Sequence, residues 1–230
     1  MYKKGDFHIH SIYSDGNCTP EEIVIISKEK NIDIISLTDH NSTGGIDEAI
    51  LAGKEFGIKV IPGVELSTRY NNSRVHILGY FRDYNYKNDL LIEILKNVKS
   101  HKISKIKRLM QNHINFYHKK DRLDTRTGIE ILKFFGATVV LAHPVLLSRN
   151  NFNELITMNF DGLEAKYYSN TDKDTEYFLN VAENNNLLYT AGSDFHDYNK
   201  FYRSHGMIGD VYLNEQELYN FLTNSNLICF

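Results

Sequence analysis

Short apolar segments alternate with helix-like segments along most of this chain, and this alternation limits the folds open to it. Strands separated by helical stretches are typical of βα units, which build a parallel sheet covered by helices. The segments that we interpret as strands cover residues 6–10, 32–38, 58–65, 74–80, 137–143, 162–166 and 187–194. The sequence therefore predicts an α/β fold around a mainly parallel sheet.

Local signals mark where the intervening helices begin and end. Thr19, Pro20 and Glu22 supply an N-cap, a first-turn proline and the glutamate of a capping box. Gly57 and Gly136 are suited to end two other helices. The expected helices cover residues 19–30, 45–56, 127–135, 151–159, 171–184 and 214–223.

One region interrupts this alternation after the fourth expected strand. Between about residues 86 and 126, apolar residues such as Leu91, Leu95 and Val98 recur at helical spacing. We therefore expect a helical insertion here. Its basic residues include Lys96, Lys99, Lys102, Lys105, Lys107, Arg108, Lys119, Lys120 and Arg122.

Length and composition fit one domain. The 230 residues, 42% of them hydrophobic, can bury a sizeable core, so we expect residues 1–230 to form a single domain. The net charge of −3 argues against binding duplex DNA through bulk positive charge. Cys18 and Cys229 give no disulfide framework. No signal-type or membrane-spanning apolar run occurs, so we expect a cytoplasmic protein without a membrane partner.

Side chains that can bind metal ions lie at or near the predicted strand ends. They are His8, His10, Asp39, His40, Glu65, His76, His143, Glu164, Asp194 and His196. A parallel barrel gathers the C-terminal ends of its strands at one rim, where barrel enzymes have their active sites. His8 and His10 are two residues apart, so both imidazoles leave the same face of a strand, and Asp194 and His196 repeat this spacing.

Each of these residues has an ordinary alternative role when it is considered alone. A strand-end histidine is more often a capping or solvent-facing residue, and a buried carboxylate is more often part of a structural ion pair. Together, however, so many carboxylates at one rim would repel each other and lose hydration unless cations compensated them. Nitrogen and oxygen ligands without thiolates are suited to zinc, manganese or iron in a hydrolytic site.

Six ordered motifs give the chain a family resemblance. They are DFHIHSIYSDG at 6–16, LTDHN at 37–41, IPGVE at 61–65, VHILG at 75–79, LAHP at 141–144 and GSDFH at 192–196. Together they resemble the PHP (polymerase and histidinol phosphatase) family, and most closely its stand-alone phosphoesterases that act on nucleotides or short RNA. The resemblance implies a distorted (β/α)7 barrel with two to three divalent metal ions.

The resemblance also implies which residues hold these ions. The ligands of the first would be His8, His10, Glu65 and Asp194. Glu65 would bridge to a second ion that is also bound by His76 and His143. The ligands of the third would be Asp15, His40 and His196.

The expected reaction is the hydrolysis of a phosphate ester. A water held between two such cations becomes hydroxide near neutral pH and attacks phosphorus in line, while the cations neutralise the phosphate oxygens. Asp39 and His196 are candidates for proton transfer because of their position beside the site. Asp39 is also suited to orient a ligand. Glu164 has a similar candidate role, and a structural carboxylate is an equally good interpretation there.

Arginines are the usual residues that bind additional phosphate groups. Arg149 follows the LAHP motif and Arg203 follows the GSDFH motif, so both are candidates for substrate binding. A solvent-exposed loop arginine is the alternative for each. His205 shares the loop of Arg203 and is a weaker candidate.

The basic insertion has two interpretations. It is either a lid that brings lysines near a polyanionic substrate, or a solvated helical face. We favour the lid, because insertions between a strand and the next helix of a barrel open onto the active rim. An Arg-Pro-His motif found in the larger insertions of similar proteins is absent from this chain.

Three functions remain open from the sequence. The first is a metal-dependent phosphoesterase acting on nucleotides, such as nucleoside bisphosphates, or on short RNA. The second is a phosphatase for a metabolite such as histidinol phosphate. The third is a metal-binding accessory or proofreading module of a polymerase. The expected partners are accordingly a phosphorylated small molecule, a nucleotide or a short oligonucleotide.

Overall fold

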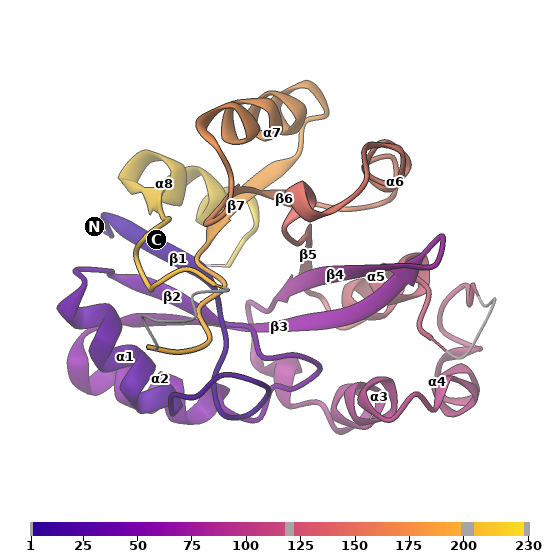
Figure 1. Ribbon diagram of the computed structural model, residues 1–230. Coiled ribbons are helices and arrows are strands. Elements are labelled where there is room, and N and C mark those ends of the chain that lie inside the picture. Colours follow the sequence, from indigo (N-terminus) through magenta and orange to yellow (C-terminus); the bar gives the residue numbers. More distant parts are fainter. Residues whose placement is uncertain (1, 118–121, 199–204, 228–230) are drawn as a thin grey trace.

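The computed structural model describes residues 2–117, 122–198 and 205–227. Figure 1 shows a curved sheet with helices around it. The strands are β1 (Lys4–Ile9), β2 (Ile34–Leu37), β3 (Lys59–Tyr70), β4 (Ser73–Tyr80), β5 (Thr138–Leu141), β6 (Gly162–Tyr167), β7 (Leu188–Gly192) and β8 (Leu213–Asn214). They form one sheet in the order β7-β6-β5-β4-β3-β2-β1-β8.

The sheet curls until its two ends approach each other. Strands β1, β2 and β3 are parallel, and so are β5, β6 and β7. At the end of β1 and just beyond β7, a parallel bridge joins Ile9 to Phe195, and the His10 N–H donates to the Phe195 carbonyl at 2.9 Å. The predicted α/β fold with a distorted, barrel-like sheet is therefore confirmed, with β8 as a short antiparallel addition beside β1.

The direction of β4 differs from the expectation. β4 runs antiparallel to both β3 and β5, so His76 lies in the middle of β4 and not at the C-terminal end of a parallel strand. The cause is local. Asn71 and Asn72, with φ of 45° and 66°, form the two-residue connection between the paired Tyr70 and Ser73. Two consecutive positive-φ residues are typical of the tight turn of a β-hairpin.

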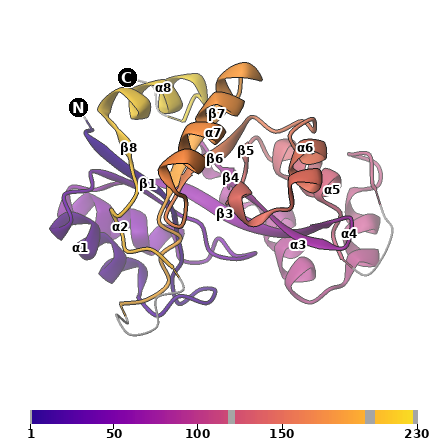
Figure 2. The same ribbon diagram turned by 45° about the horizontal axis from the view of Figure 1, so that its top comes forward.

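The helices surround the sheet in both views (Figure 1, Figure 2). They are α1 (Pro20–Glu29), α2 (Ile46–Phe56), α3 (Asp89–Lys99), α4 (Ile103–Met110), α5 (Thr125–Phe134), α6 (Arg149–Leu155), α7 (Asp172–Asn184) and α8 (Glu215–Asn224), with short 3-10 turns η1 (Tyr84–Lys87) and η2 (Pro144–Leu146). The predicted capping box of Thr19 and Glu22 is present, and Gly57 ends α2 with φ of 75°. No helix in the described ranges is both long and apolar enough to cross a membrane.

The predicted helical insertion after the fourth strand consists of α3 and α4. Both helices are amphipathic: Leu91, Ile94 and Leu95 of α3 and Ile106 and Met110 of α4 are buried in the main core. In both views the two helices lie beside the β3–β4 hairpin (Figure 1, Figure 2). Because β4 is antiparallel, its C-terminal residue Tyr80 pairs with Thr138, the first residue of β5. The insertion therefore starts from the rim opposite to the expected one, which corrects our reason for favouring a lid.

Candidate metal centre

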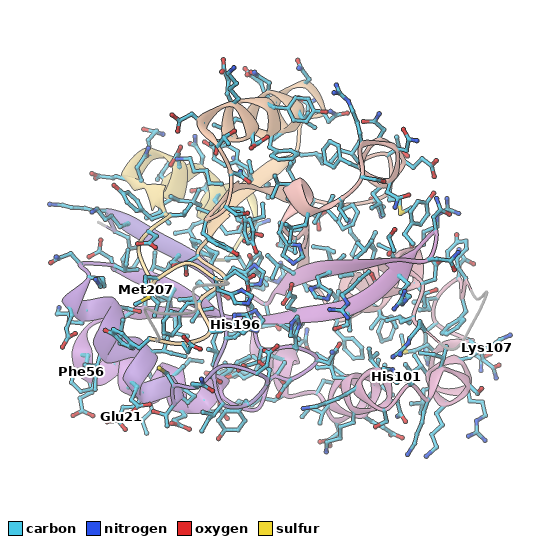
Figure 3. All side chains as sticks on the ribbon, in the orientation of Figure 1. Glu21, Phe56, His101, Lys107, His196 and Met207 are labelled. Atoms are coloured by element: carbon cyan, nitrogen blue, oxygen red, sulfur yellow. The ribbon has the colours of Figure 1, made fainter. Side chains whose placement is uncertain are left out.

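The predicted metal-binding side chains come from six strands or the segments that follow them. His8 lies on β1, Glu65 on β3 and His76 on β4, whereas His143 and Asp194 follow β5 and β7. Figure 3 labels His196, which lies near the middle of the molecule in this view. The structure brings all nine candidate ligands into a set of neighbouring groups that share members.

The innermost group consists of His8, His10, Glu65 and Asp194, whose side chains are all buried. The Nε2 atoms of His8 and His10 are 3.1 Å apart. They lie 3.3 and 3.2 Å from Glu65 Oε2, and 3.4 and 3.2 Å from Asp194 Oδ1. Four donor atoms from three distant parts of the chain therefore converge on one point.

These distances test whether the group fits a metal ion. A tetrahedral ion with bonds of 2.0–2.1 Å holds its donor atoms about 3.3–3.4 Å apart. The measured separations of 3.1–3.4 Å are close to this value. The donor set of two imidazoles and two carboxylates is also suited to zinc, manganese or iron. The residues present therefore fit a divalent cation.

Glu65 connects the inner group to a second one. Its Oε1 lies 2.9 Å from His76 Nδ1 and 3.1 Å from His143 Nε2, while its Oε2 lies 2.9 Å from His40 Nδ1. The His40 Nδ1 atom is buried and makes no hydrogen bond, although it is so close to the carboxylate. Two atoms that bind the same cation lie close together, but each directs its lone pair at the cation and not at a hydrogen on the other.

A third group surrounds Asp15, which is half exposed. Its carboxylate lies 3.3 Å from His196 Nε2, 3.5 Å from His10 Nδ1 and 3.6 Å from His40 Nε2. His10 and His40 thus face two groups each, one through either ring nitrogen. The three groups match the three ligand sets that the family resemblance implies, with His10 and His40 as additional shared members.

Two residues beside Asp194 were missed or underrated by the sequence argument. The Tyr167 hydroxyl donates to Asp194 Oδ2 at 2.7 Å, and His205 Nδ1 lies 3.1 Å from the same oxygen. The His205 ring also stacks on His196 with centroids 3.8 Å apart. Tyr167 is the last residue of β6, the strand that also carries Glu164, so its position at a strand end could have identified it as a candidate site residue. His205 had no motif around it, so only the tertiary structure reveals its position.

Glu164 and Asp39 both accept hydrogen bonds from residues of the site or of the loop beside it. Glu164 Oε1 lies 2.9 Å from His8 Nδ1, and its Oε2 accepts the backbone N–H of His143 at 2.7 Å. Such a carboxylate fixes the ring so that His8 Nε2 faces the centre. Asp39 accepts hydrogen bonds of 2.6–2.7 Å from Ser11 and Ser14, so it holds the loop after β1.

The close approach of Glu164 to His8 also depends on Gly192 of β7. A Cβ at Gly192 would overlap both Glu164 Oε1 and the Cβ of His8. The glycine of the GSDFH motif is therefore required for contact between neighbouring strands, which a larger side chain would prevent.

The electrostatics of the inner group favour charged side chains. Burial disfavours a charged imidazole, yet the carboxylates of Glu164, Glu65 and Asp194 hold the pKa of His8 well above its ordinary value. Burial likewise disfavours a charged Glu65, but His76, His8 and His40 hold its pKa well below the ordinary value. The carboxylates thus attract positive charge, which protons supply here and a cation would supply better.

Two of the candidate ligands have strained backbones. His143 and Asp194 have φ of 29° and 52°, in the left-handed region that residues with a Cβ rarely adopt. Each such residue costs about 1–3 kcal/mol and is common at functional sites. The fold accepts this cost at the two positions where the chain must turn a ligand inward directly after a strand.

The proposed substrate arginines lie differently. Arg149 stacks over the Tyr177 ring at 5.9 Å and lines a cavity of about 250 Å³ together with Pro144, Phe152 and Asp174. None of the nine candidate ligands lines this cavity. Arg203 lies outside the described residues, so its role stays a prediction.

Comparison with known proteins agrees with this geometry. The PHP domain model matches residues 6–223. A 5'-3' exoribonuclease of Haemophilus influenzae is 25% identical over 85% of this chain and 91% of its own length. A 3',5'-nucleoside bisphosphate phosphatase of Chromobacterium violaceum is 40% identical over 74 residues, which cover 32% of this chain and 26% of that protein.

A solved structure shares the fold. It belongs to a protein of Bifidobacterium adolescentis described as a candidate metal-dependent phosphoesterase, with a TM-score of 0.76, 21% identity and 95% coverage of both chains. The family model covers nearly the whole described chain, including every strand that contributes to the candidate centre. The chain therefore belongs to the PHP domain family.

Proposed function

We propose that this phosphoesterase of the PHP family uses two to three divalent metal ions to hydrolyse phosphate esters of nucleotides or short RNA. We also propose that residues 1–230 act as one catalytic domain, with α3 and α4 as an insertion in it. The names of two relatives, a 5'-3' exoribonuclease and a 3',5'-nucleoside bisphosphate phosphatase, support this class of substrate.

One observation carries the proposal. The buried carboxylates of Glu65 and Asp194 are each approached by several imidazole nitrogens within 3.7 Å. A purely structural ion pair needs one partner and good hydrogen bonds, since burying additional charge is costly. Several histidines around two acids are instead what a multi-metal hydrolytic site requires.

The residues of the chain would divide the work between them. His8, His10, Glu65 and Asp194 would hold the inner cation, and Glu65 would share a second with His76 and His143. Asp15, His40 and His196 would hold a third. Bound divalent cations supply Lewis acidity, which neutralises phosphate oxygens and lowers the pKa of water.

Proton transfer would take place at the open side of the centre. Asp15, at 53% side-chain exposure, and the partly buried His196 face solvent more than the inner group does. His196 Nδ1 lies 2.8 Å from the Asp194 carbonyl oxygen, so a proton on Nδ1 leaves Nε2 directed towards Asp15. When only two cations are bound and His196 Nε2 is free, we propose His196 as the group that manages the leaving-group proton. Asp39 would be a positioning residue that acts through Ser11 and Ser14.

A substrate panel tests the proposal. Purified protein loaded with manganese, zinc or iron would be assayed with nucleoside bisphosphates, mononucleotides, short oligoribonucleotides and histidinol phosphate. We expect the best kcat/KM with a nucleotide or oligonucleotide. Preference for histidinol phosphate would identify a metabolite phosphatase instead. No turnover of any phosphoester by metal-replete protein would contradict the proposal and favour an accessory module.

A further inference from the structure

A cleft of about 400 Å³ opens between the β3–β4 hairpin and the insertion, next to the candidate metal centre. Asp15, His40 and His76 of the centre line part of it. The rest of its wall includes four basic side chains, Arg69, Arg74, Lys99 and Arg122. We call the part of the cleft that these four side chains line the cationic cleft. All four are exposed.

The hairpin fixes the position of two of these residues relative to the centre. His76 pairs with Ser67, and Arg74 pairs directly with Arg69. Residues two apart on a strand share a face and are separated by about 7 Å along it. Arg69 and Arg74 therefore stand on the same face as the candidate ligand His76, one step further from the metal centre.

The segment before α5 brings a third basic residue to this point. The Arg69 N–H donates to the Leu123 carbonyl at 2.8 Å, and Arg69 forms a parallel bridge with Asp124. This pairing puts Arg122 beside the hairpin. Lys99, the last residue of α3, approaches from the insertion. Like charges that face each other across a sheet are destabilising, so the fold concentrates positive charge here at a cost.

The charge of the cationic cleft has no ion-pair partner in the described ranges. Ion pairs of lysine and arginine there involve Arg82, Lys87, Lys133 and Lys166. The nearby Asp124 accepts the Arg126 N–H and caps α5. Glu154 accepts from Tyr70, whose side chain leaves the opposite face of β3 from Arg69. Arg69 also donates to the Asn72 carbonyl, and Arg122 contacts the His101 ring, but neither contact supplies a negative charge. The positive charge is therefore available for an anionic ligand.

We propose that the cationic cleft binds a second phosphate of the substrate, on the other side of one ribose from the phosphate that is hydrolysed. This inference rests on the proposed function and narrows its substrate class to nucleoside bisphosphates and RNA ends. The step of about 7 Å from His76 to Arg74 is suited to the separation of phosphates across a ribose. Paired guanidiniums bind phosphate through several charge-assisted hydrogen bonds.

Kinetics with matched substrates test this proposal. The metal-loaded enzyme would be compared with Arg74→Ala and Arg69→Ala on adenosine 3',5'-bisphosphate, on the two adenosine monophosphates and on p-nitrophenyl phosphate. Losing one charged hydrogen-bond partner lowers kcat/KM by roughly 10- to 100-fold. We expect this loss for the bisphosphate, mostly through KM, and a loss at least ten times smaller for p-nitrophenyl phosphate. A pApA dinucleotide assayed in parallel distinguishes small bisphosphates from RNA ends.

Two controls make the outcome specific. Lys107→Ala removes a basic side chain of the insertion that lies at the edge of the molecule in Figure 3, away from the centre. This change should alter kcat/KM neither for the bisphosphate nor for p-nitrophenyl phosphate. Calorimetric titration of metal-free protein with adenosine 3',5'-bisphosphate measures binding without catalysis, and Arg74→Ala should weaken it at least tenfold while its thermal melt stays that of the wild type.

The results separate the two proposals. Equal losses for the bisphosphate and for p-nitrophenyl phosphate would overturn the cationic cleft and leave the phosphoesterase proposal intact. Unchanged bisphosphate binding and kinetics in Arg74→Ala would do the same. No turnover of any ester by wild-type protein would instead contradict the proposed function itself.

Discussion

The candidate metal centre and the cationic cleft lie side by side but are built in opposite ways. In the centre, buried carboxylates are surrounded by imidazoles, and Glu164 holds His8 from behind. In the cleft, exposed basic side chains such as Arg74 extend into solvent without an ion-pair partner in the described part of the chain. This difference fits the proposed division of labour, in which the buried centre would perform the chemistry and the open cleft would select the substrate.

Breaking the inner group should have the largest effect. His8→Ala removes a donor atom, and Asp194→Asn removes the negative charge of another, from a cluster whose separations are 3.1–3.4 Å. We expect activity on every substrate to fall to background, with the circular dichroism spectrum of the folded protein retained and a lower metal content by elemental analysis. Wild-type-like rates in either variant would contradict the division of labour, because phosphate esters would then be hydrolysed without an intact metal centre.

The residue that orients a ligand should have an intermediate effect. Glu164→Gln keeps the size of the side chain but puts an amide where His8 Nδ1 and the His143 N–H both need an acceptor. Loss of such a partner typically lowers metal affinity or activity by roughly 10- to 100-fold. Metal titrations followed by activity would measure this. Glu154→Gln, at the surface, is the matched control, and an equal effect of both changes would remove the orienting role.

A smaller effect is expected at the edge of the cleft. Arg122→Ala leaves the hairpin arginines in place, so kcat/KM for a nucleoside bisphosphate should fall by only about 3- to 10-fold, less than for a paired arginine. Steady-state kinetics with the bisphosphate and p-nitrophenyl phosphate would measure the difference. A larger loss than in Arg74→Ala would shift the phosphate site from the hairpin to the segment before α5.

In the metal-free protein, the pH dependence of the melting temperature tests the charges of the candidate metal centre. His8, with a raised pKa, contributes stability that is fully present below its ordinary pKa of 6.5 and is lost as pH rises through the raised value. Glu65, with a lowered pKa, contributes stability that is present above 4.5 and is lost as pH falls through the lowered value. The melting temperature should therefore be highest between pH 4.5 and 6.5 and decline on both sides.

Added metal should change this profile in one direction. Cations must displace protons from the imidazoles, so zinc or manganese should raise the melting temperature by several degrees more at pH 8 than at pH 6. Scanning fluorimetry across this range would show it. The same shift should appear in Arg74→Ala, because the cleft takes no part in it. An equal metal effect at both pH values would contradict the role of His8 and His10 as ligands.

The sequence predicted the centre better than it predicted the cleft. Period-two spacing in DFHIH and GSDFH indicated which side chains leave together, and their order along the chain indicated a barrel-like sheet. The direction of β4 was wrong, although Asn71 and Asn72 between two β-rich segments were a usable hairpin signal. His76 reaches Glu65 across that hairpin. Its position near the site was therefore predicted correctly, although we expected it at the end of a parallel strand.

The sequence by itself determined the ligand chemistry, because the side chains that bind metal are short, few in kind and tied to strand periodicity. Only the tertiary structure decided which rim the insertion starts from, that His205 contacts Asp194, and that Arg69, Arg74 and Arg122 line one cleft. Those relations depend on pairing between residues far apart in the chain. No local pattern records such pairing, since it is fixed by how strands and loops pack against each other.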